Sequence, residues 1–359
     1  MKLLFVFFYV IVIGLVEVKF RGKYQKMLLI LTCIVLTFLI GYRERWPDEE
    51  VYIAAFDSAP NLWQYSINLQ PFGYVEKGYY FLASLVKTIY NDSRFYLLVM
   101  GGLSMFLLYK SLQKYCIIPL IGICDYIARF LLNRDFTQMR SSLAILLIIM
   151  AIKYVQKKKI WHYFAIVFVA YQIHHLALVA VPFYFLCLVK FKKWHIVVGL
   201  IIAVILSQTI AGYISGTVDQ YSTDLNYETY VQGIFVTRAL GLRNPMIYFQ
   251  VFILLMFTFS ERELSSKFKY YELFRTGYFY STLILIFFCN YTALSGRTST
   301  VFASLEMFIL PMITMTWLRK NRIIYYLGIG IVFFYFFAVK YDDSMRLIHS
   351  GMTQIVGGE

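Results

Sequence analysis

The chain has 359 residues, of which 60% are hydrophobic and only 15% are charged, whereas a soluble protein is normally about a quarter charged. Its formal net charge of +14 would suit a nucleic-acid binder, but the basic residues lie in short runs between apolar segments, which encodes membrane orientation. Composition therefore excludes an ordinary soluble domain and a nucleic-acid partner. It favours an all-α bundle of transmembrane helices.

Twelve apolar segments follow one another along the chain, each a candidate helix. They cover 3–18, 27–41, 95–109, 116–132, 141–155, 160–173, 175–189, 195–213, 245–260, 276–294, 299–318 and 323–339. Several are shorter than a full crossing, so we expect about 10–12 spans in a single integral membrane domain, 1–359. The first segment imitates a signal peptide, but no small-residue cleavage pattern follows it, which favours a retained span.

Alternate connections between these segments are rich in lysine, and the positive-inside rule places them in the cytoplasm. Their basic residues are Lys19, Lys23 and Lys26; Lys110 and Lys114; Lys157, Lys158 and Lys159; Lys190, Lys192 and Lys193; Lys267 and Lys269; and Arg319, Lys320 and Arg322. Both termini are then extracytoplasmic, as are the two long connections, 42–94 and 214–244. The apolar stretch 79–90 within the first long connection is too short to span and contains Lys87. We expect it to form a short interfacial or re-entrant helix.

Arginine gathers at the predicted outer ends of the segments, where lysine is scarce. These arginines are Arg43, Arg45, Arg94, Arg134, Arg140, Arg238, Arg243 and Arg297. A guanidinium offers a planar fork of donors that matches phosphate or carboxylate. The pattern indicates an acidic or phosphate-bearing ligand, with headgroup anchoring and local ion pairs as the alternative.

The densest polar cluster covers 133–142, between two apolar segments at the predicted outer face. Arg134 and Arg140 are candidates to grip an anion, while Asp135, Thr137 and Gln138 orient it or one another. Capping of the next helix by Asp135 or Thr137 is the structural alternative.

Upstream of this cluster, Asp125, Arg129 and Asn133 recur every four residues, which predicts one stripe of a helix facing the bundle. A local ion pair between Asp125 and Arg129 is as good an explanation as a functional one.

Two further groups carry titratable side chains at predicted outer positions. His174 and His175 end a hairpin of two spans, where an imidazole is a candidate general base, although interfacial hydrogen bonding is the alternative. The polar run 295–299 is predicted to form a tight connection, and Glu306 follows it in the next apolar helix. A carboxylate inside a membrane needs a partner, so Glu306 either pairs structurally or takes part in the site.

No phosphate-binding glycine loop, Cys/His metal framework or serine-nucleophile elbow occurs in the sequence, so we expect no cofactor. The cysteines are predicted to be packing residues: Cys33, Cys116, Cys124, Cys187 and Cys289.

The order of these motifs resembles the EpsG/Wzy-type family of bacterial polysaccharide polymerases. The resemblance is carried by Arg43 with Asp48, Tyr52 and Phe56, by Glu76 to Tyr79, by Arg134 to Arg140, by His174 and His175, and by Gly296 and Arg297. Lys77 stands where proline is expected and Ser141 where glutamine is expected.

The resemblance implies an enzyme of the outer face of the bacterial cytoplasmic membrane. It would transfer a growing glycan from undecaprenyl pyrophosphate to a hydroxyl of the next lipid-linked repeat unit, without metal or nucleotide. The implied partners are these lipid-linked units and the bilayer, with a chain-length regulator as a further candidate. The candidate catalytic residues are His174, His175, Asp135, Arg134 and Arg140. The candidate substrate-binding residues are Arg43, Asp48, Tyr52, Glu76, Tyr79, Arg129, Thr137, Gln138, Arg238, Arg243, Arg297 and Glu306.

Three alternatives use similar chemistry. A flippase or exporter of the same lipid-linked sugars would carry binding residues along a path from both sides and often shows inverted repeats, and no repeat is visible here. A polysaccharide ligase shares the donor with a polymerase, and an acyltransferase would modify the same glycan. Residue chemistry alone does not separate ligase from polymerase.

Overall fold

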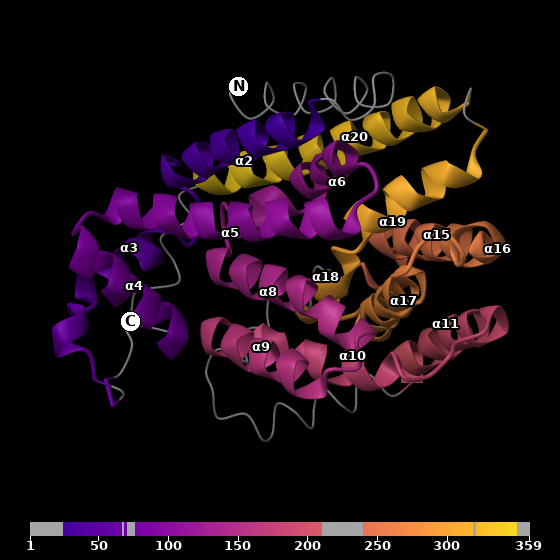
Figure 1. Ribbon diagram of the computed structural model, residues 1–359, viewed down its shortest axis with the longest axis horizontal. Coiled ribbons are helices and arrows are strands. Elements are labelled where there is room, and N and C mark those ends of the chain that lie inside the picture. Colours follow the sequence, from indigo (N-terminus) through magenta and orange to yellow (C-terminus); the bar gives the residue numbers. More distant parts are fainter. Residues whose placement is uncertain (1–23, 67, 70–75, 210–239, 319–320, 350–359) are drawn as a thin grey trace. The chain divides into compact units, whose positions relative to one another are not determined.

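The computed structural model describes residues 24–66, 68–69, 76–209, 240–318 and 321–349, which Figure 1 shows as coloured ribbons. All regular secondary structure in these ranges is helical, and no strand occurs in them. The predicted all-α fold is therefore confirmed. The predicted span 3–18 and most of the predicted loop 214–244 lie outside the described residues.

Three described helices are long and apolar enough to cross a membrane: α5 (Ser93–Tyr115), α8 (Met139–Gln156) and α20 (Arg322–His349). The bent pair 294–303 and 306–316 makes a fourth if it forms one span. Shorter apolar helices are α2 (Gln25–Gly41), α9 (Ile160–Ile173), α11 (Lys193–Thr209), α15 (Pro245–Phe259) and the segment His175–Leu186. The total of about 10–12 spans stays a prediction.

The chain divides into two compact units, and the first comprises 1–178 and 317–359. In this unit α2 packs along α5, α5 along α8, and α8 along α9. Small residues allow the first of these contacts, because a Cβ on Gly101 would lie 2.8 Å from Ile40 Cγ2. The predicted loop 42–94 contains α3 (Glu49–Ser58), η1 (Leu62–Gln64) and α4 (Lys77–Ile89). The short helix expected at 79–90 is thus present as α4, and its depth in a membrane stays a prediction.

The segment between α5 and α8 is a broken helix made of α6 (Pro119–Tyr126), the π-helical turn η2 (Ile127–Leu131) and α7 (Leu132–Arg134). A π turn holds more residues than an α turn, so side chains four apart no longer share one face. Asp125 and Arg129 are buried, but Asn133 is exposed. The predicted stripe is therefore wrong at Asn133. Lys340 Nζ of α20 donates to the Arg129 carbonyl at 2.6 Å, which anchors α20 on this turn.

The second unit, 179–316, is organised around α17 (Tyr271–Phe287). Its neighbours in contact are α10 (Ala180–Leu186), α11, α15 and α18 (Thr292–Ala303). The remaining elements are η4 (Gly241–Arg243), α16 (Glu261–Leu264), α19 (Glu306–Ile313) and η5 (Thr314–Thr316). The five-residue 3-10 helix η3 (His175–Val179) precedes α10 along the chain.

The polar run 295–299 forms part of helix α18, so the predicted tight connection there is wrong. Thr298 Oγ1 of this run donates to the Leu294 carbonyl at 2.5 Å, and Thr300 Oγ1, just after the run, donates to the Arg297 carbonyl at 2.8 Å. Polar side chains that hydrogen-bond to carbonyls of their own helix can be accommodated within the helix and do not require a loop. The chain bends instead by 51° between 294–303 and 306–316, which places Glu306 at the first residue of α19.

Candidate functional site

A buried ion pair joins two segments that are far apart in the sequence. Glu76 lies directly before α4, and Arg140 lies in the first turn of α8. Arg140 Nη1 donates to Glu76 Oε2 at 2.5 Å, and the two side chains are only 8% and 6% exposed. A buried pair of this kind adds little net stability, but removal of one partner leaves a costly uncompensated charge.

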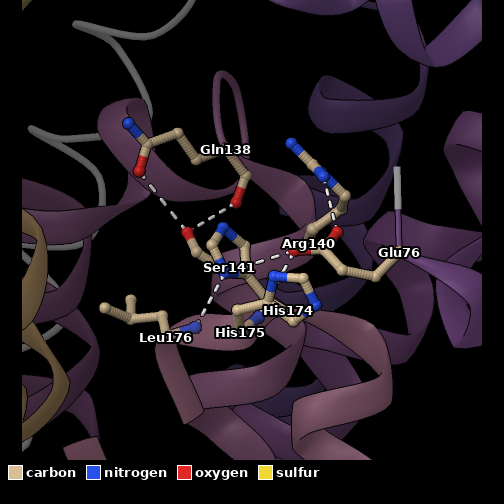
Figure 2. A network of polar contacts seen from close by, with 7 residues as sticks. All are labelled: Glu76, Gln138, Arg140, Ser141, His174, His175 and Leu176. Atoms are coloured by element: carbon tan, nitrogen blue, oxygen red, sulfur yellow. Dashed lines mark hydrogen bonds and ion pairs between the residues drawn. The ribbon is translucent and has the colours of Figure 1, made fainter. Parts of the chain in front are cut away.

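The two histidines meet the other oxygen of the same carboxylate, as Figure 2 shows. The backbone N–H of His175 donates to Glu76 Oε1 at 3.3 Å, and His174 Nδ1 lies 3.6 Å from that oxygen. The His174 side chain is 23% exposed and His175 is exposed. The structure therefore brings Glu76, Arg140, His174 and His175 together at a point that remains open to one side. We call these four residues the charged cluster.

The hydrogen bonding of His174 determines its protonation. The Leu176 N–H donates to His174 Nδ1 at 3.1 Å. A ring nitrogen that accepts a hydrogen bond carries no proton, so this contact places the ring proton on Nε2. His174 Nδ1 also faces Glu76 Oε1 at 3.6 Å. In this tautomer Nε2–H is the hydrogen-bond donor of the His174 ring.

Glycine at position 78 allows α4 to approach the end of α9. A Cβ on Gly78 would lie 2.5 Å from the carbonyl oxygen of Gln172, a distance that real Cβ atoms essentially never show. Because Glu76 precedes this contact by two residues and His174 follows Gln172 by two, the close approach places the carboxylate beside the histidines.

Two tyrosines form an aromatic wall beside the charged cluster. Tyr52 of α3 and Tyr79 of α4 are 1% and 0% exposed, and their ring centroids lie 5.8 Å apart. Arg140 Cζ lies 5.9 Å from the Tyr52 ring centroid, within cation–π range. Burial raises the pKa of the Tyr52 and Tyr79 hydroxyls, so both stay protonated.

Arg43 is a second buried guanidinium near this wall. It is 3% exposed, and its donors reach the Ile40 carbonyl and Met139 Sδ, each at 2.9 Å. No carboxylate of the described residues lies within ion-pair distance of it, and its Nε has no hydrogen-bond partner among them. Burial lowers the pKa of Arg43, an effect that the Glu49 carboxylate opposes. A buried cation paired only with a carbonyl and a sulfur suits an anionic ligand.

The loop that carries Arg43 is fixed by an ion pair that sequence reasoning did not single out. Arg94 Nη1 contacts Glu49 Oε1 at 2.7 Å and the Arg43 carbonyl at 2.5 Å, and Glu49 Oε2 accepts from the Trp46 N–H at 3.1 Å. Asp48 and Arg45 have φ values of 62° and 60°, an unusual backbone region for residues other than glycine. The half-buried Asp48 therefore holds a place in a constrained turn. The sequence feature that could have indicated this ion pair is the acidic residue Glu49 in a loop with several predicted outer arginines.

Asp135 lies in a buried network of hydroxyl groups. Tyr126 Oη donates to Asp135 Oδ2 at 2.6 Å, and Ser142 Oγ donates to Oδ1 at 2.7 Å. The Asp135 side chain is 1% exposed, and burial raises its pKa, although both hydroxyl groups oppose that shift. This arrangement ties the turn between α7 and α8 to the helices on either side.

The rest of the predicted cluster 133–142 surrounds this turn. Arg134 Cζ lies 4.3 Å from the Phe130 ring centroid, and Thr137 Oγ1 donates to the Leu132 carbonyl at 3.0 Å. Gln138 accepts from Ser141 Oγ at its own carbonyl, 2.9 Å, as Figure 2 shows. Helix α8 begins after Gln138 without a side-chain cap, so the capping role considered for Asp135 and Thr137 is not seen.

Other predicted site residues lie elsewhere. Arg129 is buried in η2, with its Cζ 4.9 Å from the Phe336 ring centroid. In the second unit Arg243 is exposed in η4, Arg297 is half-buried in α18, and the buried Glu306 accepts from Tyr278 Oη at 2.9 Å. Arg238 lies outside the described residues. The roles predicted for these residues stay predictions.

We expect replacement of Asp135 by alanine to reduce the stability of the protein much more than replacement by asparagine. Asp135→Ala removes the shared acceptor of the Tyr126 and Ser142 hydroxyl groups, which can then bond only to each other, 3.1 Å apart, and should lower the free energy of unfolding by about 1–3 kcal/mol. Asp135→Asn keeps an acceptor and removes a charge that burial disfavours, so it should change stability by less than about 1 kcal/mol. Thermal unfolding of the purified variants in one detergent measures both, and equal losses would contradict the network described here.

The apolar helices and the charged cluster together define a multi-pass membrane protein with a buried ionic site. A family model described as the EpsG family matches residues 26–348, nearly the whole chain. The chain therefore belongs to the EpsG family, a Wzy-type polymerase family, and the resemblance noted from the motifs is confirmed. Comparisons with curated proteins and with solved structures found no match.

Proposed function

We propose that this protein is a polysaccharide polymerase of the outer face of the bacterial cytoplasmic membrane. It transfers a growing glycan from undecaprenyl pyrophosphate to a hydroxyl of the next lipid-linked repeat unit. Family membership supports the membrane polymerase class. The observation that carries the proposal is the charged cluster, in which Glu76 joins Arg140 to His174 and His175.

The arginines supply positive charge for the leaving diphosphate. Arg43, Arg94, Arg134 and Arg140 are four guanidiniums of this region, and Glu49, Glu76 and Asp135 are three buried carboxylates, which leaves a net charge of one positive (4 − 3 = +1). In a site of low dielectric constant, fixed positive charge stabilises the negative charge that develops on a leaving group. Arg43 contributes most in this proposal, because no described carboxylate neutralises it.

The two histidines take different roles in the proposed reaction. The acceptor O–H attacks the anomeric carbon, the bond from that carbon to the phosphate oxygen breaks, and the diphosphate leaves with the electron pair. His175 takes the hydroxyl proton, since its imidazole is exposed and its only described side-chain contact is with the Tyr171 ring, 5.0 Å away between centroids. His174 Nε2–H donates to a substrate oxygen, because Leu176 occupies its Nδ1.

The remaining polar residues position these groups. Asp135 anchors the turn between Arg134 and Arg140, while Tyr52 and Tyr79 line the buried side of the cluster. Asp135 therefore acts as a positioning residue, given that it is 1% exposed and bonded to Tyr126 and Ser142. A regulator of chain length is a candidate partner of the exposed surface.

The test is the length of the surface polysaccharide in a deletion strain complemented at equal protein levels. Deletion should leave a single capped repeat unit. His175→Ala should reduce polymer by about 100-fold or more, as expected for loss of a general base. His162, exposed on α9 and stacked with Tyr154, provides the matched control, and His162→Ala should restore the full ladder.

Each contrary outcome points to another class. Repeat units stranded on the cytoplasmic side in the deletion strain would indicate a flippase. Finished chains that fail to reach their final acceptor would indicate a ligase. A full-length ladder in the deletion strain would refute polymerase function, and full activity of His175→Ala would refute the assigned base.

A further inference from the structure

A groove in the second unit has the dimensions and the polarity of a lipid site. It has a volume of about 380 Å³ and lies among the end of α10, one face of α11 and one face of α17. Phe191, just before α11, also lines it. The residues of α11 that line it recur at helical spacing: Trp194, His195, Val198, Gly199 and Ile202. Such a spacing places them on one face of the helix, which forms one wall of the groove along its length.

The helices on either side of the groove run parallel. Arg275 Nη2, near the start of α17, donates to the Phe191 carbonyl at 2.8 Å. Asn290, after the end of α17, contacts the Ser207 carbonyl near the end of α11 at 3.5 Å. The groove therefore has one end at Phe191 and Thr276 and the other at Ile202 and Leu283.

The two ends differ in chemistry. The first end is aromatic, with Trp194 and His195 ring centroids 3.9 Å apart, and it adjoins the exposed Lys190 and Lys192. The Lys192 N–H donates to His195 Nδ1 at 2.8 Å, so the His195 proton sits on Nε2. The far end, at Ile202 and Leu283, is aliphatic. This polarity matches a molecule with one anionic head and an apolar chain.

The length of the groove matches one leaflet. The rise from Trp194 to Ile202 along α11 is about 12 Å at 1.5 Å per residue, close to the thickness of about 15 Å for half of the hydrocarbon core. Tryptophan and lysine at one end are typical of the membrane–water boundary. Trp194 is 58% exposed, Val198 41% and Ile202 48%, so the wall is open to surrounding lipid.

We propose that this groove binds an anionic glycerophospholipid. One acyl chain lies along the face of α11, and the phosphate meets Lys190, Lys192 and His195 Nε2–H. The positive-inside prediction places these lysines at the cytoplasmic leaflet, so the site is separate from the proposed reaction on the outer face. The bound lipid holds α11 against α17. This inference does not rest on the proposed polymerase function.

The test uses the purified full chain mixed with equal amounts of dioleoylphosphatidylglycerol and dioleoylphosphatidylcholine, with bound lipid measured by native mass spectrometry. Phosphatidylglycerol should be retained preferentially. Lys190→Gln with Lys192→Gln should lower that preference by about 25-fold, or about fivefold for each lysine. Lys193 is left in place because its Nζ lies 3.9 Å from Glu261 Oε2.

Two further variants test whether the effect comes from surface charge in general and whether the lipid lies in the groove. Lys157→Gln with Lys159→Gln removes two exposed lysines from another connection assigned to the same side and should leave the preference unchanged. Ile202→Trp fills the aliphatic end and should reduce tight binding of both lipids. A monodisperse elution profile with an unfolding temperature close to that of wild type shows that each variant is folded.

Four outcomes would overturn the proposal. These are equal retention of the two lipids, an equal loss with the Lys157 and Lys159 pair, and unchanged binding in Ile202→Trp. The fourth is displacement of phosphatidylglycerol by equimolar undecaprenyl phosphate, which would make the groove a polyprenyl site instead.

Discussion

Replacement of Arg140 by glutamine is expected to abolish polymer formation and to destabilise the protein. Glutamine is too short to keep the 2.5 Å contact with Glu76 and carries no charge, so it leaves a 6% exposed carboxylate without its ion pair. Loss of one partner of a buried pair typically costs about 3–5 kcal/mol. Loss of a charge that stabilises the leaving group typically lowers the rate by about 100-fold or more.

A second variant separates the two effects. Glu76→Gln combined with Arg140→Gln removes both charges, and two amide groups can hydrogen-bond to each other without a buried charge. The double variant should therefore recover much of the lost stability, because neutral replacement of a buried pair is often tolerated. Polymer should remain absent, since the guanidinium is still missing.

Thermal unfolding in one detergent measures the stabilities, and the polysaccharide ladder at equal protein levels measures function. Recovery of the ladder together with stability in the double variant would show that the pair is only structural. An Arg140→Gln variant with wild-type stability would instead contradict the buried ion pair itself.

Replacement of Gly78 by alanine should have the second largest effect, although the change adds only one methyl group. The new Cβ would meet the Gln172 carbonyl oxygen at 2.5 Å and the Gln172 carbonyl carbon at 2.8 Å, which are backbone atoms that no rotamer change can move. The start of α4 must then shift from the end of α9. We expect a loss of about 1–3 kcal/mol in the free energy of unfolding, as for overpacked cores. Polymer should fall by about 100-fold, because displacement of a positioned group by about 1 Å has that effect.

Gly102 in α5 provides the matched control for this change. A Cβ there would lie 3.5 Å from Thr37 Cγ2, an ordinary van der Waals distance. Gly102→Ala should therefore stabilise the helix by about 0.5–1 kcal/mol, the usual gain for alanine over glycine, and leave the ladder intact. If Gly78→Ala behaves like this control in both measurements, α4 and α9 do not hold the charged cluster together.

The separate parts of the site were predictable from the sequence. The run from Arg134 to Arg140, the histidine pair and Glu76 each appeared as polar groups that an apolar chain would not keep without reason. Their junction was not predictable, because Glu76 and Arg140 are 64 positions apart and no periodicity links them. Only the packing of α4 against α9, and of α8 against α9, brings the carboxylate to the arginine and the histidines.

Errors in the predicted elements have local physical causes. Serine, threonine and glycine favour turns, which predicts a connection at 295–299, yet the Thr298 and Thr300 hydroxyl groups bond to carbonyls of their own helix. Asn133 was expected beside Asp125 and Arg129, but the π turn η2 shifts the spacing. In both places hydrogen bonds within the helix determined the local structure. The polarity of the side chains does not predict these bonds.

The sequence by itself determined that lipid surrounds most of the chain and that its regular secondary structure is helical. An abundance of apolar residues broken by short basic runs requires backbone hydrogen bonds to be satisfied within helices, whatever the contacts between them. Tertiary structure alone decided which charges pair and which remain without a carboxylate, as Arg140 and Arg43 show. The reason is that helix formation depends on neighbours a few residues away, whereas a buried charge is compensated by whichever group packing brings within about 4 Å.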